Sequence, residues 1–226
     1  MGSFLRTERV TAAVVLVTLD RPERRNALSI AVRDEISGEL DRLAADDDLK
    51  VVVVTGAGPV FCSGFDLAEF DAAATDPALA ERLWASSDRY HRTLATFPLI
   101  TVAAVNGPAV AGGFDLAVLC DLRVASTTAT FSHPEHAFGD VVYGPLRDLV
   151  GGAWARDLCL TGRSIDADEA RAVGLVSAVA EPDAVVDAAL AVAAQVAVGP
   201  RDVILRTKAK ALAHSGLDPT RTTLAL

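Results

Sequence analysis

The sequence predicts an α/β fold, because strand-like and helix-like segments alternate along most of the chain. Short apolar runs such as Leu49–Thr55 have the length and β-branched content of strands that are buried on both faces. The longer segments between them repeat apolar residues at helical spacing. With 226 residues, of which 51% are hydrophobic and 23% charged, the chain is long enough to build one large core.

The first part of the chain predicts a strand, a helix and a second strand. Residues Ala12–Leu19 are apolar and β-branched, and the loop Asp20–Asn26 ends this strand with proline and charge. Ser29 is the expected N-cap of a helix whose apolar residues recur every three or four positions. The strand at Leu49–Thr55 follows and ends at Gly56.

A second helix and strand lead to a turn that contains two glycines. Pro77 is typical of the first turn of a helix, and Phe97 before a proline is expected to end it. Ile100–Val105 predicts the next strand, and Gly112 and Gly113 follow it. Residues Phe114–Cys120 are expected to be helical, with Gly112 at the end where free amides point outward.

The remaining segments complete the alternation and then become helical. Two short strands are expected, followed by four helices, in which Asp166 and Glu169 have capping-box spacing. The expected strands are 122–125 and 130–132, and the expected helices are 145–160, 166–172, 183–198 and 201–213.

Charge and cysteine content restrict the classes of function. The net charge of −9 and the pI near 4.9 oppose binding to nucleic acid or to an anionic membrane surface. The cysteines, Cys62, Cys120 and Cys159, form no Cys-x-x-Cys pair, so neither a metal site nor a disulfide framework is indicated. The expected protein is soluble and cytoplasmic, because the sequence shows neither a signal-peptide pattern nor a long uncharged apolar run.

The paired-glycine turn has the chemistry of an anion-stabilising site. Gly112 lets a ligand approach the backbone closely, and Asp115 would lie on the first turn of the following helix. Segment Phe61–Leu67 also follows an apolar strand and also places a glycine, Gly64, beside an outward-facing amide. Two such turns could give two N–H donors to one oxygen that gains negative charge.

The motifs as a set resemble the enoyl-CoA hydratase/isomerase, or crotonase, family. The resemblance covers roughly residues 10–180 and implies a crotonase-like spiral of ββα units with a helical C-terminal region. It implies a spiral core over 1–180 and a C-terminal helical region over 181–226. It also implies an acyl-CoA substrate, no metal, no cofactor beyond the CoA of the substrate, and a homotrimer or dimer of trimers. The matching segments are 20–28, 61–67, 103–116, 120–123, 134–135, 160–163 and 167–176.

The resemblance also implies roles for individual residues. The amides of Phe65 and Gly112 would form the oxyanion hole, and Asp115 and Glu135 would occupy the two acid/base positions. Substrate binding is assigned to Arg24, Arg25, Ala27, Asp66 and Leu67. A second basic cluster, Arg206, Lys208 and Lys210, lies where family members often bring a basic residue to the nucleotide.

Departures from the family pattern leave three functions open. The family's hydratases usually have glutamate at the position of Asp115, the segment 139–146 replaces a glycine-rich one, and the C-terminus is short. The leading interpretation is a 2-enoyl-CoA hydratase, that is, a lyase of fatty acid metabolism. The alternatives are a double-bond isomerase that uses Glu135, or a catalytically weak subunit that binds acyl-CoA or a partner. Near the altered segment, His133, His136, Asp140 and Tyr143 are favoured as surface or supporting residues.

Overall fold

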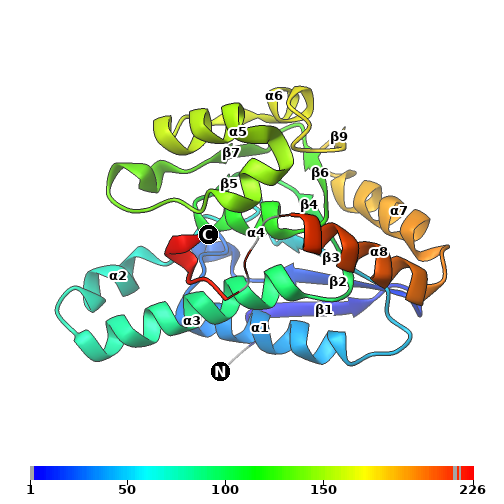
Figure 1. Ribbon diagram of the computed structural model, residues 1–226, viewed down its shortest axis with the longest axis horizontal. Coiled ribbons are helices and arrows are strands. Elements are labelled where there is room, and N and C mark those ends of the chain that lie inside the picture. The colour runs from blue at the N-terminus through cyan, green and yellow to red at the C-terminus, as the bar shows by residue number, and fades with distance from the viewer. Residues whose placement is uncertain (1–2, 216–217, 219) are drawn as a thin grey trace.

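The computed structural model describes residues 3–215, 218 and 220–226, and it confirms the α/β fold class (Figure 1). The strands are β1 (Leu5–Arg9), β2 (Val14–Leu19), β3 (Val51–Gly56), β4 (Ile100–Val105), β5 (Ala109–Val110), β6 (Leu122–Ser126), β7 (Thr130–Ser132), β8 (Ile165–Asp166) and β9 (Ala178–Ala180). The α-helices are α1 (Ile30–Ala44), α2 (Leu67–Ala73), α3 (Pro77–Thr96), α4 (Gly112–Leu119), α5 (Gly144–Thr161), α6 (Ala167–Ala172), α7 (Val185–Ala197) and α8 (Arg201–His214). Short 3₁₀ helices are η1 (Pro22–Arg24), η2 (Pro134–Ala137) and η3 (Thr223–Ala225).

The strands form one large and one small sheet. The six-stranded sheet has the order β1-β2-β3-β4-β6-β9, and all its pairs are parallel except β1 with β2. The three-stranded sheet has the order β5-β7-β8. Parallel neighbours need crossover connections, and here helices such as α1 and α3 provide them.

The central strands are buried on both faces, as their composition predicts. In β3, Val52 and Val54 pack with the main core, whereas Val51 and Val53 pack on the opposite face with residues of α7. This alternation follows from the two-residue period of a strand. The large sheet is therefore covered by α7 on one face and by the core beneath α1, α3 and α4 on the other.

Capping explains why the predicted helices begin where they do. The Ser29 side chain accepts a hydrogen bond from the Val32 amide, and the Asp166 side chain accepts one from the Glu169 amide. The Glu169 carboxylate binds Arg163 instead of completing the capping box. Helix α4 begins at Gly112, two residues before the predicted start, so that Gly112 is itself at the amino end of the helix.

Several elements were not predicted. Strands β1, β5, β8 and β9 and helix α2 lie in segments that were expected to be irregular or were left unassigned. The predicted helix at 145–160 forms as α5 but is kinked at Gly151, whose φ of 75° and ψ of 165° are not helical. Most of these elements are too short to show a clear hydrophobic period.

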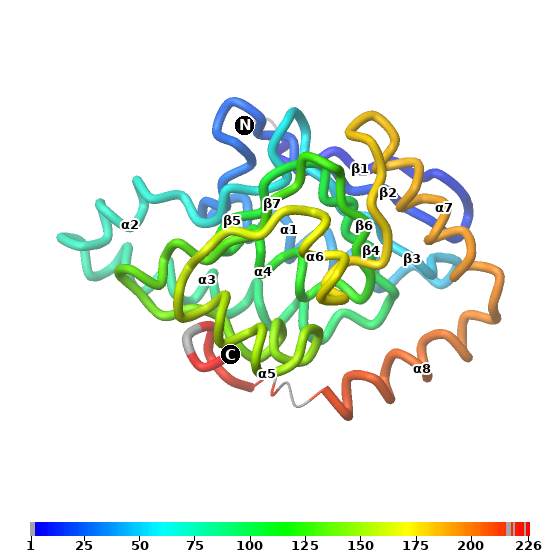
Figure 2. The backbone as a smooth tube through the Cα atoms, turned by 90° about the horizontal axis from the view of Figure 1, so that it is seen from above, coloured from blue at the N-terminus to red at the C-terminus, as the bar shows by residue number. Residues whose placement is uncertain are grey.

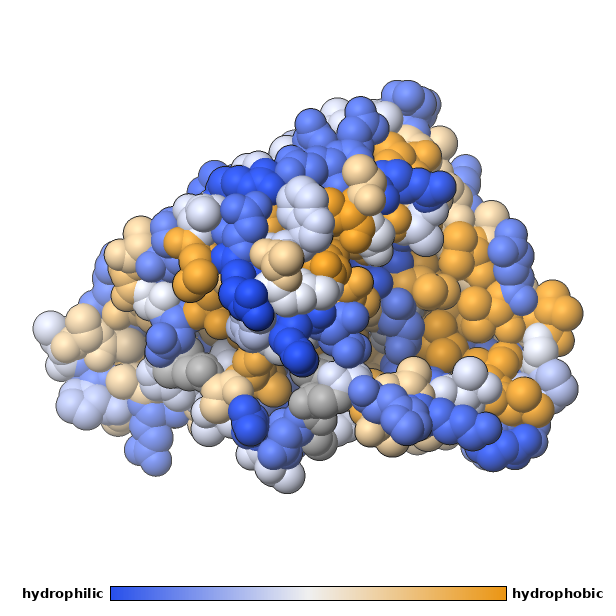
Figure 3. All heavy atoms as spheres, turned by 45° about the horizontal axis from the view of Figure 1, so that its top comes forward, coloured by the Kyte–Doolittle hydropathy of each residue, from blue (hydrophilic) through white to orange (hydrophobic). Residues whose placement is uncertain are grey.

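The C-terminal part of the chain returns to the body of the protein. Helix α7 lies against the large sheet, and η3 lies beside α3, as the ribbon and tube views show (Figures 1 and 2). Apolar residues gather on the side of the surface that α7 forms (Figure 3). Among the described residues no single helix is long and apolar enough to cross a membrane, although α7 and α8, bent by 106°, meet such limits as a pair.

Candidate active site

Three loops are brought together by pairing in and around the small sheet. Strands β5 and β7 are parallel, with Ala109 opposite Phe131, and Cys62 forms an isolated parallel bridge with Ala109. Because parallel segments end at the same edge, the residues that follow each of them meet there. The loop with Phe65, the amino end of α4, and η2 with its Glu135 therefore border one site.

The two predicted oxyanion amides lie on loops that touch. Gly64 has a φ of +83°, and a Cβ atom there would lie 2.7 Å from Val110 O and 3.2 Å from Gly112 N. Within the described part of the chain, the amides of Phe65 and Gly112 donate no hydrogen bond to a protein acceptor. Both donors are thus available to a ligand oxygen.

Backbone strain is stored immediately before Gly112. Ala111 has φ 52° and ψ −127°, a conformation that costs a residue with a side chain about 1–3 kcal/mol. Its amide donates to Ser132 O at 2.9 Å, and its carbonyl accepts from the amides of Phe114 and Asp115. These bonds hold the strained residue and fix the direction of the next amide.

Asp115 is buried between two histidine rings. Its side chain is 6% exposed, and its Oδ2 lies 3.7 Å from His91 Nε2 while its Oδ1 lies 3.9 Å from His133 Nε2. Neither distance is a direct hydrogen bond. Among buried side-chain atoms of the described residues, Asp115 Oδ1 and both Nε2 atoms have no hydrogen-bond partner.

Glu135 is tied to the same cluster through His133. The His133 Nδ1 lies 2.8 Å from Glu135 Oε1, whereas the buried Oε2 has no partner among the described residues. The Phe114 ring stacks on the His133 ring with centroids 4.7 Å apart. Burial lowers the pKa of His133, but the hydrogen bond to Glu135 and the charges of Asp115 and Glu135 outweigh it and raise that pKa above 6.5. The two predicted carboxylates are therefore linked by a ring that favours a positive charge.

The arginine loop is shaped by Asn26. Its side-chain amide donates to the carbonyls of Ala57 and Val60, and its oxygen accepts from the Arg21 amide. Arg24 and Arg25 are exposed and form no ion pair with any described residue. They are free to meet an anionic ligand.

The other predicted substrate-binding residues have mixed surroundings. Ala27 is buried, and Leu67 is 63% exposed at the start of α2. Asp66 caps α2 and forms an ion pair with Arg21 at 3.0 Å. For these three residues a role in binding stays a prediction.

The second basic cluster does not form as predicted. Lys208 is buried, and its Nζ lies 2.7 Å from both Leu99 O and Asp121 Oδ2. Arg206 pairs with Asp202 on the surface of α8. Lys208 thus anchors α8 to the sheet, and its assignment to the nucleotide is wrong.

The sequence predicted a surface or supporting role for His133, His136 and Asp140, and it missed two other residues. His133 is fully buried in contact with a carboxylate, which fits the supporting role and excludes the surface one, whereas His136 and Asp140 are exposed. His91 was missed, although it lies two turns after Leu83 on the buried face of α3. Arg33 was missed as well.

Arg33 supports the oxyanion loop from behind. Its guanidinium is fully buried, lies 4.4 Å from the Phe65 ring centroid and donates to Leu28 O at 2.6 Å. Leu28 forms a parallel bridge with Phe65. Burial lowers the pKa of Arg33. This arginine fixes both the ring and the backbone around the Phe65 amide.

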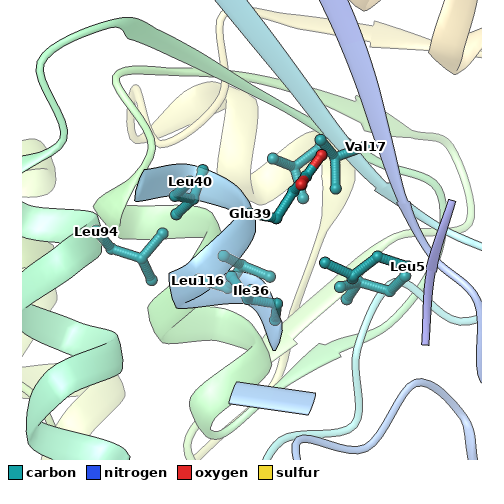
Figure 4. Close-up of a pocket in the computed structure, with 9 residues that line it drawn as sticks. Leu5, Val17, Ile36, Glu39, Leu40, Leu94 and Leu116 are labelled. Carbon is teal, nitrogen blue, oxygen red and sulfur yellow. The ribbon is translucent and has the colours of Figure 1, made fainter. Parts of the chain in front are cut away.

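Other candidate centres are less suited to catalysis. A small apolar cavity lies between α1 and the sheet and is bordered by Leu94 and Leu116, behind the helix that carries Asp115 (Figure 4). Burial raises the pKa of the Cys62 thiol to about 12, which disfavours a thiolate nucleophile. The residues that the structure describes include no group of three or more His, Cys, Asp or Glu side chains placed to hold a metal ion.

Comparisons with known proteins show which family this chain resembles. The family model for enoyl-CoA hydratase/isomerase matches residues 9–225. A Thermus thermophilus protein provisionally named an enoyl-CoA hydratase is 41% identical over 209 residues, covering 90% of this chain and 82% of its own. The 2,3-dehydroadipyl-CoA hydratase of Escherichia coli is 38% identical over 191 residues, which cover 81% of this chain and 72% of that protein.

A solved structure extends the similarity to the whole fold. The enoyl-CoA hydratase of Mycobacterium smegmatis superimposes with a TM-score of 0.87 at 30% sequence identity, covering 96% of this chain and 85% of its own. The sequence match and the shared fold indicate the same family. This chain belongs to the enoyl-CoA hydratase/isomerase family.

Proposed function

We propose that this protein is an enoyl-CoA hydratase that adds water across the double bond of a 2-enoyl-CoA thioester. Two observations support the proposal: the amides of Phe65 and Gly112, on loops that touch, donate to no acceptor among the described residues, and the carboxylates of Asp115 and Glu135 both lie beside the His133 ring. The amides suit an enolate-like oxygen, and the carboxylates suit proton transfer beside the acyl chain.

The residues divide the reaction between two ends of the site. Asp115 holds the water, whose oxygen gives one proton to a base of the site and bonds to the β-carbon as the π electrons of the double bond move toward the thioester oxygen. The Phe65 and Gly112 amides stabilise the negative charge on that oxygen, and one such donor is worth about 3 kcal/mol. Glu135, whose Oε2 is unpartnered, delivers the proton to the α-carbon.

The exposed arginine loop is the proposed site for the phosphates of CoA. Arg24 and Arg25 lie in the loop that Asn26 fixes, and their side chains have no carboxylate partner among the described residues. Local positive charge can attract a small anion even though the whole chain is acidic. The substrate then supplies the only CoA that the reaction needs, and we propose no further cofactor.

Isomerisation is the second candidate, because it needs less of the site. A 1,3-proton shift requires one carboxylate that takes a proton and returns it, and Glu135 Oε2 is free to do so. Loss of the Asp115 carboxylate would then change the rate of isomerisation little. The two reactions therefore predict different responses to substitution.

Paired substitutions test this choice. With a panel of short, branched and aromatic enoyl-CoAs, Glu135→Gln is expected to lower both hydration and isomerisation by at least about 10²-fold. Asp115→Asn is expected to lower the rate of hydration far more than that of isomerisation. Asp115→Glu tests whether the shorter side chain of Asp115 limits its contact with the water and so the rate of hydration. Hydration that survives Asp115→Asn unchanged would favour the isomerase. Binding of acyl-CoA without any turnover would favour a catalytically weak interaction subunit.

We also propose a homotrimer or dimer of trimers. Support comes from the apolar side of the surface at α7 (Figure 3) and from Val198 and Val203, which are 87% and 45% exposed. Such residues are stabilised when a second subunit covers them. Light scattering that shows a stable monomer at micromolar concentration would reject this proposal.

A further inference from the structure

Four side chains form one continuous row of acid–base groups. His91 faces Asp115, Asp115 faces His133, and His133 binds Glu135. They come from α3, α4 and the segment after β7, so the row joins three separate parts of the chain. Four of its buried atoms have no hydrogen-bond partner among the residues that the structure describes: His91 Nε2, Asp115 Oδ1, His133 Nε2 and Glu135 Oε2.

The hydrogen bonds of His91 fix which nitrogen carries the proton. Its Nδ1 lies 3.0 Å from Ser87 O and 3.1 Å from Thr223 Oγ1. A carbonyl oxygen can only accept, so Nδ1 must be the donor. In the neutral ring Nε2 then holds a lone pair, and that lone pair faces Asp115 Oδ2 at 3.7 Å.

Two acceptors that face each other in a buried site need a donor between them. A water molecule can donate one hydrogen to His91 Nε2 and the other to Asp115 Oδ2, which leaves the lone pairs of its oxygen free. Such a water is oriented as a nucleophile. Transfer of its proton to Nε2 would place the new positive charge beside the Asp115 carboxylate, which stabilises it.

We propose that His91 is the general base of the hydration, acting on a water that it shares with Asp115, and that His133 returns the proton to Glu135. This inference rests on the proposed hydratase function. The water loses a proton to His91 Nε2 as its oxygen bonds to the β-carbon, and Glu135 gives a proton to the α-carbon. The proton then on His91 passes through Asp115 and His133 back to Glu135, so the enzyme is restored and one water has been added.

The C-terminal tail holds the base in place. Thr223 is 5% exposed, its hydroxyl lies 2.9 Å from Ser87 Oγ as well as near His91, and its amide donates to Asp88 Oδ1 at 2.8 Å. Gly144 at the start of α5 donates to Leu226 O at 2.6 Å. Thr223 is therefore a positioning residue for His91.

The first test is independent of turnover. Nitrogen-15 NMR of the histidine rings in the wild-type protein is expected to show His91 protonated at Nδ1 and unprotonated at Nε2 when neutral. A neutral His91 with its proton on Nε2 would overturn the inference whatever reaction the protein catalyses. This measurement needs no variant, so a substitution that fails to fold leaves the test intact.

The second test compares His91→Gln with His214→Gln, a matched change at an exposed histidine of α8. Hydration is expected to fall by about 10²-fold or more in the first and to stay unchanged in the second. Exchange of the α-hydrogens of a saturated acyl-CoA with deuterated solvent, which needs only Glu135, is expected to stay within about fivefold. Wild-type protein that hydrates no enoyl-CoA refutes the proposed function, whereas hydration that survives His91→Gln refutes only the role of His91.

The pH dependence of the hydration rate distinguishes a catalytic role of His91 from a purely structural one. A reaction that uses a general base becomes faster with rising pH over the range in which the base is deprotonated, and His91→Gln is expected to abolish this limb of the hydration profile. The groups around His91 remain in the variant, so a limb that persists would belong to one of them and would count against His91. These groups are Asp115, Tyr90, Cys62, Asp88, Arg33, His133 and Glu135.

The tail has its own test in the same assays. Thr223→Val is expected to lower hydration by about fivefold, the value of one neutral hydrogen bond, with a shifted pH limb, and Thr223→Ser is expected to restore both. An unshifted limb in Thr223→Val would show that the tail does not act through His91.

Discussion

Gly64 offers the sharpest test of the two-loop site, because its replacement acts on both amides at once. In Gly64→Ala the new Cβ would lie 2.7 Å from Val110 O and 2.9 Å from Ala111 Cβ. Distances this short force the two loops apart. The φ of +83° adds about 1–2 kcal/mol of strain for any residue with a side chain.

Gly174 provides the matched control. Its φ is +79°, but a Cβ atom there would meet nothing within 4 Å. Gly174→Ala therefore carries the same backbone strain without the displacement. We expect it to lower the free energy of unfolding by about 1–2 kcal/mol, which corresponds to a melting temperature about 2–8 °C lower, and to leave turnover unchanged.

The activity of Gly64→Ala should fall even under conditions in which the variant is fully folded. Displacement of one oxyanion donor costs about 10²- to 10³-fold in kcat, whereas KM should change little, because the arginine loop is untouched. Steady-state kinetics well below the melting temperature, with folding checked by circular dichroism, measure both effects. A folded Gly64→Ala that keeps kcat within about threefold of the wild type would refute the idea that the contact between these loops builds the oxyanion hole.

Three further predictions follow from separate features. Ala111→Gly should relieve strain and raise the unfolding free energy by about 1 kcal/mol, yet lower kcat several-fold as the Gly112 amide loses its fixed direction; calorimetry and kinetics check both. Replacing Arg24 and Arg25 with glutamine should raise KM for the acyl-CoA about tenfold with a weaker dependence on salt, and an unchanged KM at low salt would reject the loop as the CoA site. The raised pKa of His133 stabilises the fold below about pH 6.5, and this stabilisation is lost as pH rises through the folded-state value. The unfolding free energy of the wild type relative to His133→Gln should thus fall from about pH 6 to about pH 9; a constant difference would contradict it.

Local sequence signals were enough for the parts of the site that depend on one turn. Gly112 and Asp115 lie in the first turn of α4, and the strand, paired glycines and helix around them have recognisable compositions. The order of motifs then placed Glu135 in the same site. His91 had no such signal, because it reaches Asp115 only through the packing of α3 on α4.

Other features depend on contacts that single segments do not encode. Arg33 is buried because three oxygen acceptors, including Leu28 O and Leu83 O, surround its guanidinium, and its place on an otherwise ordinary helix gives no sign of this. Lys208 looked like a surface cation in a basic cluster, but Asp121 from the loop before β6 pairs with it. Long-range pairing decides whether a charged residue is free or structural.

The backbone, more than any one side chain, fixes how the two carboxylates face each other. Val110 pairs with Ser132 in the parallel register of β5 and β7, and the Ala111 amide donates to Ser132 O. His133 follows directly, so its ring is set beside α4 by main-chain hydrogen bonds. A shift of one residue in this register would turn His133 to the opposite face and separate Asp115 from Glu135. Because the frame does not depend on the length of the acid on α4, a carboxylate as short as that of Asp115 can occupy it.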